Sequence, residues 1–418
     1  MLYDVVVVGG GPAGLAAALE AEKKGVSVLV VERDVELGGI LPQCIHQGFG
    51  LFVFGEMWTG PEYAQHYVDR VESSKNIDVL LDTMVLEVGP SRVVVTNKID
   101  GVVEFEAGAV VLAMGCRERT RNQILIPGSR PAGVFTAGTT QRLINVDGIM
   151  PGSRVVVVGS GDVGLIMARR FLLEGAEVLG VFEIMPYPGG LGRNIVQCLD
   201  DFDIPLHLSE TMVEIHGKNR VEAVSVAKVD PVSWKPDMSS VRRLECDVVV
   251  LAVGLIPENE LSRECGLLLD EVTGGPVVDE KMSCSVPGVF ACGNVVHVHD
   301  VVDDVTVASV VAGSCAADFA FEDKHEELSK RCVVAGKNVS YVVPQRLSEK
   351  CCLDEVVLYL RVSGVLENVE VIVTCEDDVI FSKVERVLRP PEMVKIVLDK
   401  EKLGRRVGDV SVEVKPHG

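Results

Sequence analysis

Two glycine-rich turns, each followed by a glutamate, carry the clearest chemistry in this sequence. In both, a short apolar run leads into the spacing Gly-x-Gly-x-x-Gly, and a glutamate closes the next apolar run. The residues are Gly9, Gly11 and Gly14 with Glu32, and Gly159, Gly161 and Gly164 with Glu183. Glycines at these places allow a tight turn, a close backbone approach to a diphosphate and close packing of helix on strand. Because the helix start offers free N–H groups and the glutamate can accept from a ribose diol, each motif predicts a dinucleotide site.

The second glutamate also bears on which dinucleotide binds. A carboxylate at Glu183 favours the free 2′-hydroxyl of NAD and repels the 2′-phosphate of NADP. No Arg or Lys follows Glu183 until Arg193. The motif therefore favours NAD(H), while the alternative is that Glu183 only caps the exposed end of a strand.

The surrounding sequence predicts the strand–turn–helix–strand unit that such a motif needs. The first copy has apolar runs at 3–8 and 27–31 around a helical pattern at 15–24, and the second has runs at 154–158 and 177–183 around a pattern at 165–174. Gly25 and Gly175 follow the two helical patterns as natural stops. Repetition of a whole unit predicts two nucleotide-binding domains, and a flavin beside a nicotinamide makes chemical sense because hydride moves between them.

Three later strands and a β-rich end complete the predicted organisation. Strands that run into small-residue turns are expected at 109–115, 247–254 and 287–294, and a helix is expected at 306–321. From Cys332 onwards short alternating runs predict an all-β domain, most simply a small sandwich, with Glu322–Arg331 as the linker.

In this order the motifs resemble those of the two-dinucleotide flavoprotein reductases. This pyridine nucleotide-disulfide reductase-like superfamily includes thioredoxin reductase and NADH oxidase, and the resemblance covers about residues 1–325. It implies an α/β protein with two Rossmann-like domains, FAD-binding at 1–117 and 257–325 and NAD-binding at 118–256, followed by a small all-β domain at 332–418. The residues implied for FAD are Gly9, Gly11, Pro12, Ala13, Gly14, Glu32, Arg33, Gly38, Gly39, Ala113, Gly115, Gly293 and Asn294. Those implied for NAD(H) are Gly159, Gly161, Asp162, Val163, Gly164, Glu183 and Gly254.

A closer resemblance is to the FAD/NAD subunits encoded with glycerol-3-phosphate dehydrogenase, opine oxidase and hydrogen cyanide synthase. It rests on the segments 38–50, 115–120 and 293–300 and on the β-rich end, including Ser340–Pro344. It implies an electron-transfer subunit that works with a second flavoprotein dehydrogenase and a small Cys-rich protein, which could carry an iron–sulfur cluster. An oligomeric assembly is expected on the same ground.

The sequence departs from the wider superfamily at two points. Asn294 stands where an Asp usually binds the flavin ribityl chain, although an amide can still accept from a hydroxyl. No C-x-x-C pair exists among the 12 cysteines, so dithiol chemistry and Cys-ligated clusters within this chain are not expected.

Single residues near the expected flavin allow more than one interpretation. Cys44 could be a redox-active cysteine of the kind that oxygen- and peroxide-reducing relatives use, or a buried structural thiol. His46 could donate a proton or tune the flavin, or be an ordinary loop histidine. His297, His299 and Asp300 suggest metal ligands, but residues this close seldom complete a coordination shell, so no metal is predicted. A place at the pyrimidine end of the flavin, or on a partner surface, is the preferred interpretation of this cluster.

Arg117 and Arg119 follow the Gly115 turn and also allow two interpretations. They could contact a dinucleotide pyrophosphate, or form a salt bridge in the hinge between the two domains.

Composition narrows the remaining classes of function. The chain has 61 acidic and 40 basic residues, a formal charge of -21, so nucleic acid and anionic lipid are poor partners; the charge can equally serve solubility alone. No uninterrupted apolar stretch reaches membrane-spanning length and no export signal is recognised, so a cytoplasmic protein is expected. The leading hypothesis is an NADH-linked electron-transfer subunit; the alternatives are a stand-alone NADH oxidase or peroxidase, and a scaffold subunit with a structural FAD.

Overall fold

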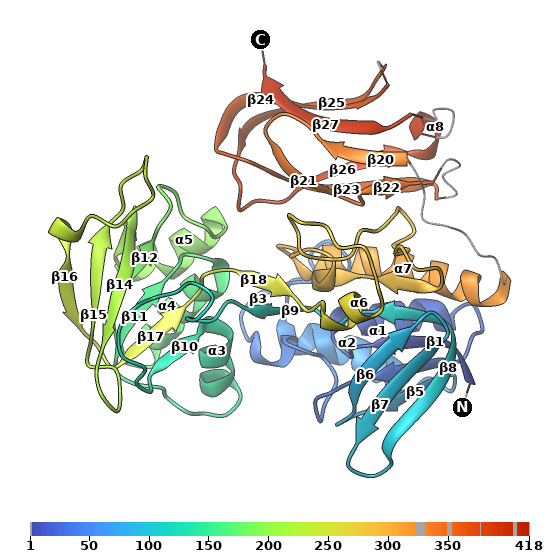
Figure 1. Cartoon of the computed structure of the whole chain (residues 1–418), viewed down its shortest axis with the longest axis horizontal. Helices are drawn as coiled ribbons and strands as arrows, with labels where there is room; N and C mark the ends of the chain where they lie inside the picture. Colours follow the sequence, from blue (N-terminus) through green and yellow to red (C-terminus); the bar gives the residue numbers. More distant parts are fainter. Residues whose placement is uncertain (1, 323–330, 349–352, 377, 404–407, 418) are drawn as a thin grey trace. The chain divides into compact units, whose positions relative to one another are not determined.

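A computed structural model describes residues 2–322, 331–348, 353–376, 378–403 and 408–417 of the 418-residue chain. The chain forms two compact units: Met1–Cys116 together with Pro257–Gly418, and Arg117–Ile256. We call them the first and the second unit. The second unit is thus inserted into the sequence of the first, and Figure 1 shows the segments of each unit by their colours.

The main sheet of the first unit gathers the carboxyl ends of five strands at one edge. Its order is β5-β2-β1-β8-β7-β6, and β19 pairs with the end of β8. The strands β1, β2, β5, β8 and β19 run parallel, so that Val8 lies beside Val31 and Leu112, and Leu112 beside Ala291. The bounds are β1 (Leu2–Val8), β2 (Val28–Val31), β5 (Ile77–Leu80), β6 (Met84–Gly89), β7 (Arg92–Asn97), β8 (Gly101–Leu112) and β19 (Val289–Ala291). The valine runs of β1 and β2 are buried because parallel strands of this kind are covered on both faces.

Two long helices pack closely on this sheet. They are α1 (Pro12–Glu22) and α7 (Val302–Glu322), and a Cβ added at Gly313 would lie 2.1 Å from the carbonyl oxygen of Ala17. Among the described residues, α7 is the one helix with the length and hydropathy of a membrane span. Its contacts with α1, β1 and β8 are those of a core helix, which meets the same criteria. The other helical elements of the nucleotide-binding part are η1 (Leu41–Gln43), α2 (Gly60–Glu72), α6 (Glu260–Glu264) and η4 (Gly293–Val295).

The second unit repeats the parallel arrangement on a smaller scale. Its five-stranded sheet has the order β10-β17-β11-β12-β13, and every pair in it is parallel. The elements are β10 (Val134–Thr136), α3 (Ala137–Asn145), β11 (Arg154–Val158), α4 (Asp162–Leu173), β12 (Glu177–Glu183), α5 (Gly192–Cys198), η2 (Asp200–Phe202), β13 (Leu206–Leu208) and β17 (Val248–Leu251). An antiparallel sheet of β14 (Glu210–His216), β15 (Ala223–Lys228) and β16 (Arg242–Glu245) joins it, with η3 (Met238–Ser240).

The β-rich end of the chain forms two sheets around a core of its own, which confirms the predicted all-β character. One sheet has the order β22-β20-β27-β24-β25 and the other β21-β23-β26. Their bounds are β20 (Arg331–Ala335), β21 (Val339–Val343), β22 (Arg346–Leu347), β23 (Glu355–Val362), β24 (Leu366–Cys375), β25 (Asp378–Leu388), β26 (Val394–Asp399) and β27 (Val410–Pro416), with the short helix α8 (Lys400–Leu403). Residues 323–330 of the predicted linker lie outside the described residues. Short ribbons pair β3 (Gln47–Phe49) with β4 (Trp58–Thr59) and β9 (Cys116–Glu118) with β18 (Leu255–Pro257).

Candidate functional site: two dinucleotide turns

The first glycine turn leaves no room for a side chain at Gly9 or at Gly14. Gly9 has φ +108°, and a Cβ there would lie 2.5 Å from the carbonyl oxygen of Ala113. A Cβ at Gly14 would lie 1.8 Å from the carbonyl oxygen of Gly9. Gly39 approaches the same turn, since a Cβ on it would be 2.9 Å from the Cα of Gly11. The turn between β1 and α1 is therefore a backbone surface that a diphosphate can approach closely.

Glu32 joins the end of β2 to this turn. Its carboxylate is buried and accepts hydrogen bonds from Gly10 N at 2.7 Å and from Asp34 N at 2.8 Å. Gly38 N also donates to the carbonyl oxygen of Gly10 at 2.9 Å. These bonds fix the carboxylate beside the glycine turn, where a ribose diol could donate to its remaining lone pairs. The neighbouring Arg33, which the resemblance implied for FAD, is exposed.

The other residues predicted for FAD reach the same edge from β8 and β19. Ala113 N donates to the carbonyl oxygen of Val8 at 2.9 Å. Gly293 has φ +71°, and a Cβ on it would be 2.8 Å from the Cβ of Ala13. Asn294 follows directly, and its amide nitrogen lies 3.7 Å from the Sγ of Cys116. Segments far apart in the sequence thus meet around the start of α1, where no side chain within the described ranges caps the helix.

The residues present at this edge fit a flavin dinucleotide. Side-chain-free turns, an uncapped helix N-terminus and a fixed carboxylate are what the diphosphate and the adenosine ribose of FAD require. Asn294 and the turn at Gly293 start at the carboxyl end of β19, next to the turns at Ala113 and Gly9. They would hold the part of the cofactor beyond the diphosphate.

The second unit contains a near copy of this arrangement. Gly159 has φ +86°, and a Cβ on it would be 2.2 Å from the carbonyl oxygen of Ala252; a Cβ at Gly164 would be 2.4 Å from the Cβ of Ala252. Glu183 is buried and accepts from Ser160 N at 2.8 Å and from Met185 N at 3.0 Å. Glu32 accepts the equivalent two bonds in the first unit: one from the second residue of its turn, Gly10, and one from the residue two positions after it, Asp34. The residues of this turn therefore fit a second dinucleotide.

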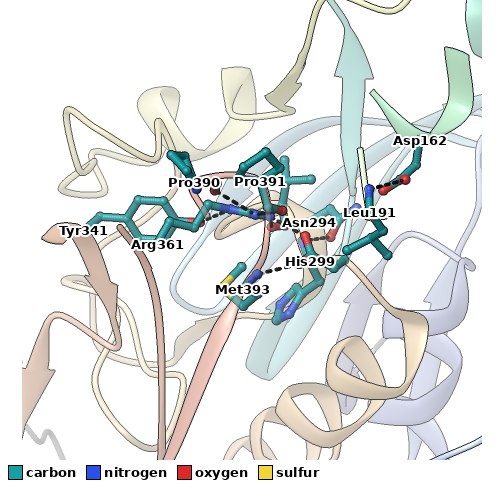
Figure 2. A network of polar contacts seen from close by, with 11 residues as sticks. Asp162, Leu191, Asn294, His299, Tyr341, Arg361, Pro390, Pro391 and Met393 are labelled. Atoms are coloured by element: carbon teal, nitrogen blue, oxygen red, sulfur yellow. Dashed lines mark hydrogen bonds and ion pairs between the residues drawn. The ribbon is translucent and has the colours of Figure 1, made fainter. Parts of the chain in front are cut away.

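A loop that the sequence did not single out closes against the second turn. Ser160 Oγ donates to Glu183 at 2.6 Å and accepts from Gly189 N at 2.7 Å. Asp162, at the start of α4, accepts from Leu191 N at 2.8 Å (Figure 2) and from Asn194 Nδ2 at 2.6 Å. Asp162 thus orients residues 189–194 at the mouth of the turn. The adjacent glycines 189 and 190 were the available sequence signal for this loop.

The remaining predicted residues of the second unit have structural contacts in the same region. Val163, the next residue of α4, packs against the core of this unit. Gly254 has φ +104°, and its carbonyl oxygen accepts from Arg119 N at 2.9 Å. A Cβ at Gly254 would be 3.7 Å from the Cδ of Arg119, so this arginine lies against the turn that follows β17. These contacts are with the protein's own atoms and leave the pyrophosphate role of Arg119 a prediction.

Cys44 and His46 lie in the turn after η1. The thiol of Cys44 donates to the carbonyl oxygen of Ile40 at 3.4 Å, and desolvation by the surrounding protein raises the pKa of Cys44 to about 12. A reactive cysteine needs the opposite shift, because the thiolate is the reactive form. His46 is half-buried, and its Nδ1 lies 3.1 Å from the carbonyl oxygen of Gln47. Their redox and proton-donor roles remain predictions.

A buried carboxylate that the sequence did not reveal fixes the next part of this loop. Asp303, in the first turn of α7, is 1% exposed and accepts from Gly50 N, Phe52 N and Val53 N at 2.9–3.1 Å. The side chain of Phe52 is nevertheless 77% exposed. Asp303 therefore stabilises the backbone of a loop that follows Cys44 and displays an aromatic side chain.

Comparison with known proteins places this geometry in a family. The family model of the pyridine nucleotide-disulphide oxidoreductases matches residues 3–312. The HcnB subunit of hydrogen cyanide synthase from Pseudomonas protegens is 29% identical over 64% of this chain and 60% of its own length. NAD(P)H sulfur oxidoreductase (CoA-dependent) of Pyrococcus abyssi is 30% identical over 71% and 64%, and an opine oxidase subunit of Agrobacterium tumefaciens is 26% identical over 70% and 61%. The chain thus spans less than two thirds of the length of these relatives.

Solved structures share the fold. The thioredoxin reductase of T. acidophilum has a TM-score of 0.60 at 24% identity, covering 77% of this chain and 98% of its own. A NAD-dependent persulfide reductase from A. fulgidus has a TM-score of 0.58 at 21% identity, covering 96% and 72%. The family model covers most of the chain and includes both glycine turns, which confirms the resemblance seen in the sequence. The chain belongs to the pyridine nucleotide-disulphide oxidoreductase family, whose members depend on FAD and NAD(P)H.

Proposed function

We propose that this chain is an FAD-dependent NAD(H) oxidoreductase that serves as the electron-transfer subunit of a complex. The observation that carries the proposal is the repeated geometry of the two turns, with Glu32 and Glu183 each bound to the second residue of its turn. The first unit would hold FAD and the second NAD(H). When bound, the two cofactors supply hydride transfer between nicotinamide and flavin.

The protein's own contribution is binding and orientation. The starts of α1 and α4 direct N–H groups at the two diphosphates, and the buried carboxylates hold the adenosine riboses. Glu183 supports NAD(H) over NADP(H), because a fixed negative charge beside a 2′-phosphate is unfavourable. The turn at Gly293 and Asn294 would hold the flavin side of FAD.

The proposed partner is a second flavoprotein dehydrogenase, of the glycerol-3-phosphate dehydrogenase-like class, together with a small Cys-rich protein. Two of the similar proteins, from hydrogen cyanide synthase and from opine oxidase, are named as subunits, which supports a role in a complex. We propose that this complex is cytoplasmic. The direct test is purification of the native chain through an affinity tag under low salt. A stoichiometric second flavoprotein supports the complex, and a chain that purifies alone with full turnover contradicts it.

Anaerobic addition of NADH tests the redox part separately. Loss of the visible flavin absorbance on mixing supports hydride transfer, whereas a flavin that stays oxidised supports a scaffold role. The second candidate function is an NADH oxidase or peroxidase, as one similar protein is named an NADH oxidase. Fast oxygen or peroxide turnover by the isolated chain, lost in Cys44→Ser, would favour it. The raised pKa of Cys44 argues against a reactive thiolate at this position.

A further inference from the structure

A largely buried ion pair joins the C-terminal strands to the segment that follows Asn294. Arg361 lies on β23, and its side chain is 18% exposed, while that of its partner Asp300 is 15% exposed. The guanidinium donates to Asp300 Oδ1 at 2.5 Å, to the carbonyl oxygen of Val298 at 3.2 Å and to Tyr341 Oη at 3.1 Å (Figure 2). A planar guanidinium with this many acceptors fixes direction as well as distance.

The same network continues to the amide of Asn294. The second oxygen of Asp300 accepts from Met393 N at 2.6 Å, so the C-terminal region binds both of its oxygens. His299, which precedes Asp300, donates its backbone N–H to Asn294 Oδ1 at 3.0 Å (Figure 2). The orientation of Asn294 is therefore set by a segment whose far end is held by Arg361.

Two buried imidazoles keep the intervening segment packed. The rings of His297 and His299 lie 4.1 Å apart, and both contact the ring of Tyr359 on β23, at 5.6 and 5.2 Å. Burial is the main cause that lowers the pKa of both histidines, that of His299 to about 3. Both rings are neutral at physiological pH and act as packing groups, so the ion pair is the charged contact that aligns the segment.

We propose that Arg361 is a positioning residue for the flavin site, acting on Asn294 through Asp300 and the backbone of His299. The proposal rests on the proposed placement of Asn294 at the flavin. Without Arg361 the carboxylate of Asp300 loses its charged partner and keeps the bond from Met393 N, so the segment 295–300 is held less firmly. Side chains that contact a cofactor keep their geometry only when their supporting contacts are fixed. The C-terminal region would then contribute to flavin binding without touching the flavin.

The test is the FAD dissociation constant of the full chain, measured from flavin fluorescence, together with the visible spectrum of the bound flavin. Arg361→Met should raise the dissociation constant about tenfold, a coupling of ordinary size between linked sites, and shift the flavin absorbance band. Arg361→Lys keeps the charge but not the planar fork, so an intermediate value is expected. If Arg361→Met does not fold, Arg361→Lys is the variant that tests the proposal.

The matched control is Lys395→Met, which removes the ion pair of Lys395 with Asp304 from the same region. It should leave the dissociation constant within about twofold, since this pair is more exposed and Lys395 meets the segment only indirectly, through the ring of Tyr359 over which its Nζ lies at 5.8 Å. If Arg361 acts through Asn294, the double variant Arg361→Met/Asn294→Leu should bind FAD no more weakly than Asn294→Leu alone.

Two results would overturn the proposal, and they are distinguishable. Unchanged FAD affinity and spectrum in folded Arg361 variants, with Asn294→Leu impaired, would refute the positioning role and leave the flavin placement standing. Unchanged FAD affinity in Asn294→Leu would refute the placement of the flavin at Asn294, and with it the role of Arg361.

Discussion

Replacing Glu183 by Gln should shift the chain's preference from NADH towards NADPH. The carboxylate is buried and held by Ser160 and Met185, so it is a fixed negative charge at the expected ribose position. A unit charge acting on a phosphate charge about 5 Å away, at an effective dielectric of about 20, contributes about 3 kcal/mol. Water at the mouth of the turn reduces this to about 1–2 kcal/mol, which corresponds to about a 5- to 30-fold change in relative kcat/KM.

The measurement is kcat/KM for NADH and for NADPH with one artificial electron acceptor at constant ionic strength. The chain provides its own control in Glu32→Gln, because Glu32 makes equivalent bonds in the first turn. That variant should weaken FAD binding and leave the NADH:NADPH ratio unchanged. The reasoning is refuted if Glu183→Gln changes the ratio by less than about twofold, or if Glu32→Gln changes it as much.

Three further predictions, two on substitutions and one on cysteine alkylation, test other parts of the structure. Gly164→Ala should lower kcat/KM for NADH at least about tenfold and leave FAD bound, because the new Cβ would be 2.4 Å from that of Ala252. The control Gly364→Ala has open space around the new Cβ and should change neither kcat/KM for NADH nor FAD binding. Burial, and after it the charge of Glu280, raises the pKa of Asp279 from 3.8 to about 7, so this one carboxyl should lower the free energy of unfolding by up to about 4 kcal/mol as the pH rises from 4 to 8. In urea titrations Asp279→Asn should lose less stability over this pH range than the wild type, and an equal loss would contradict the assignment. Because burial raises the pKa of Cys44 to about 12, very little of its thiol should be ionised at pH 8, and alkylation followed by mass spectrometry should be slow. Rapid labelling with an inflection below pH 8 would instead support the oxidase function.

Local patterns were sufficient to predict the buried strands, the two glycine turns and the glutamate that follows each of them. Apolar runs identified the buried parallel strands, because a strand covered on both faces has no need to alternate. The glycine spacing and the two glutamates were visible without any tertiary information. Both helices after the turns begin earlier than predicted, at Pro12 and Asp162, since the last part of each glycine motif already belongs to the helix.

Contacts between distant segments could not be read from the sequence. Asp303 binds backbone groups some 250 positions earlier, and nothing in the local pattern of α7 distinguishes it from an ordinary first-turn acid. The sequence places Asp300 next to two histidines but gives no sign of its ion-pair partner Arg361, which lies on a strand of the C-terminal region. Such pairs depend on topology, which a single sequence does not specify.

The discontinuous sheet of the first unit has a consequence for synthesis on the ribosome. The end of β8 needs β19 as its neighbour, but the whole of residues 117–256 is translated between them. Until β19 and α7 emerge, the nascent chain carries an open strand edge and an uncovered apolar face, both of which promote aggregation. A second unit that folds quickly by itself would limit this exposure, so a nascent chain arrested with residues 117–256 outside the ribosome and β19 still inside it should contain a compact second unit and an incomplete first unit.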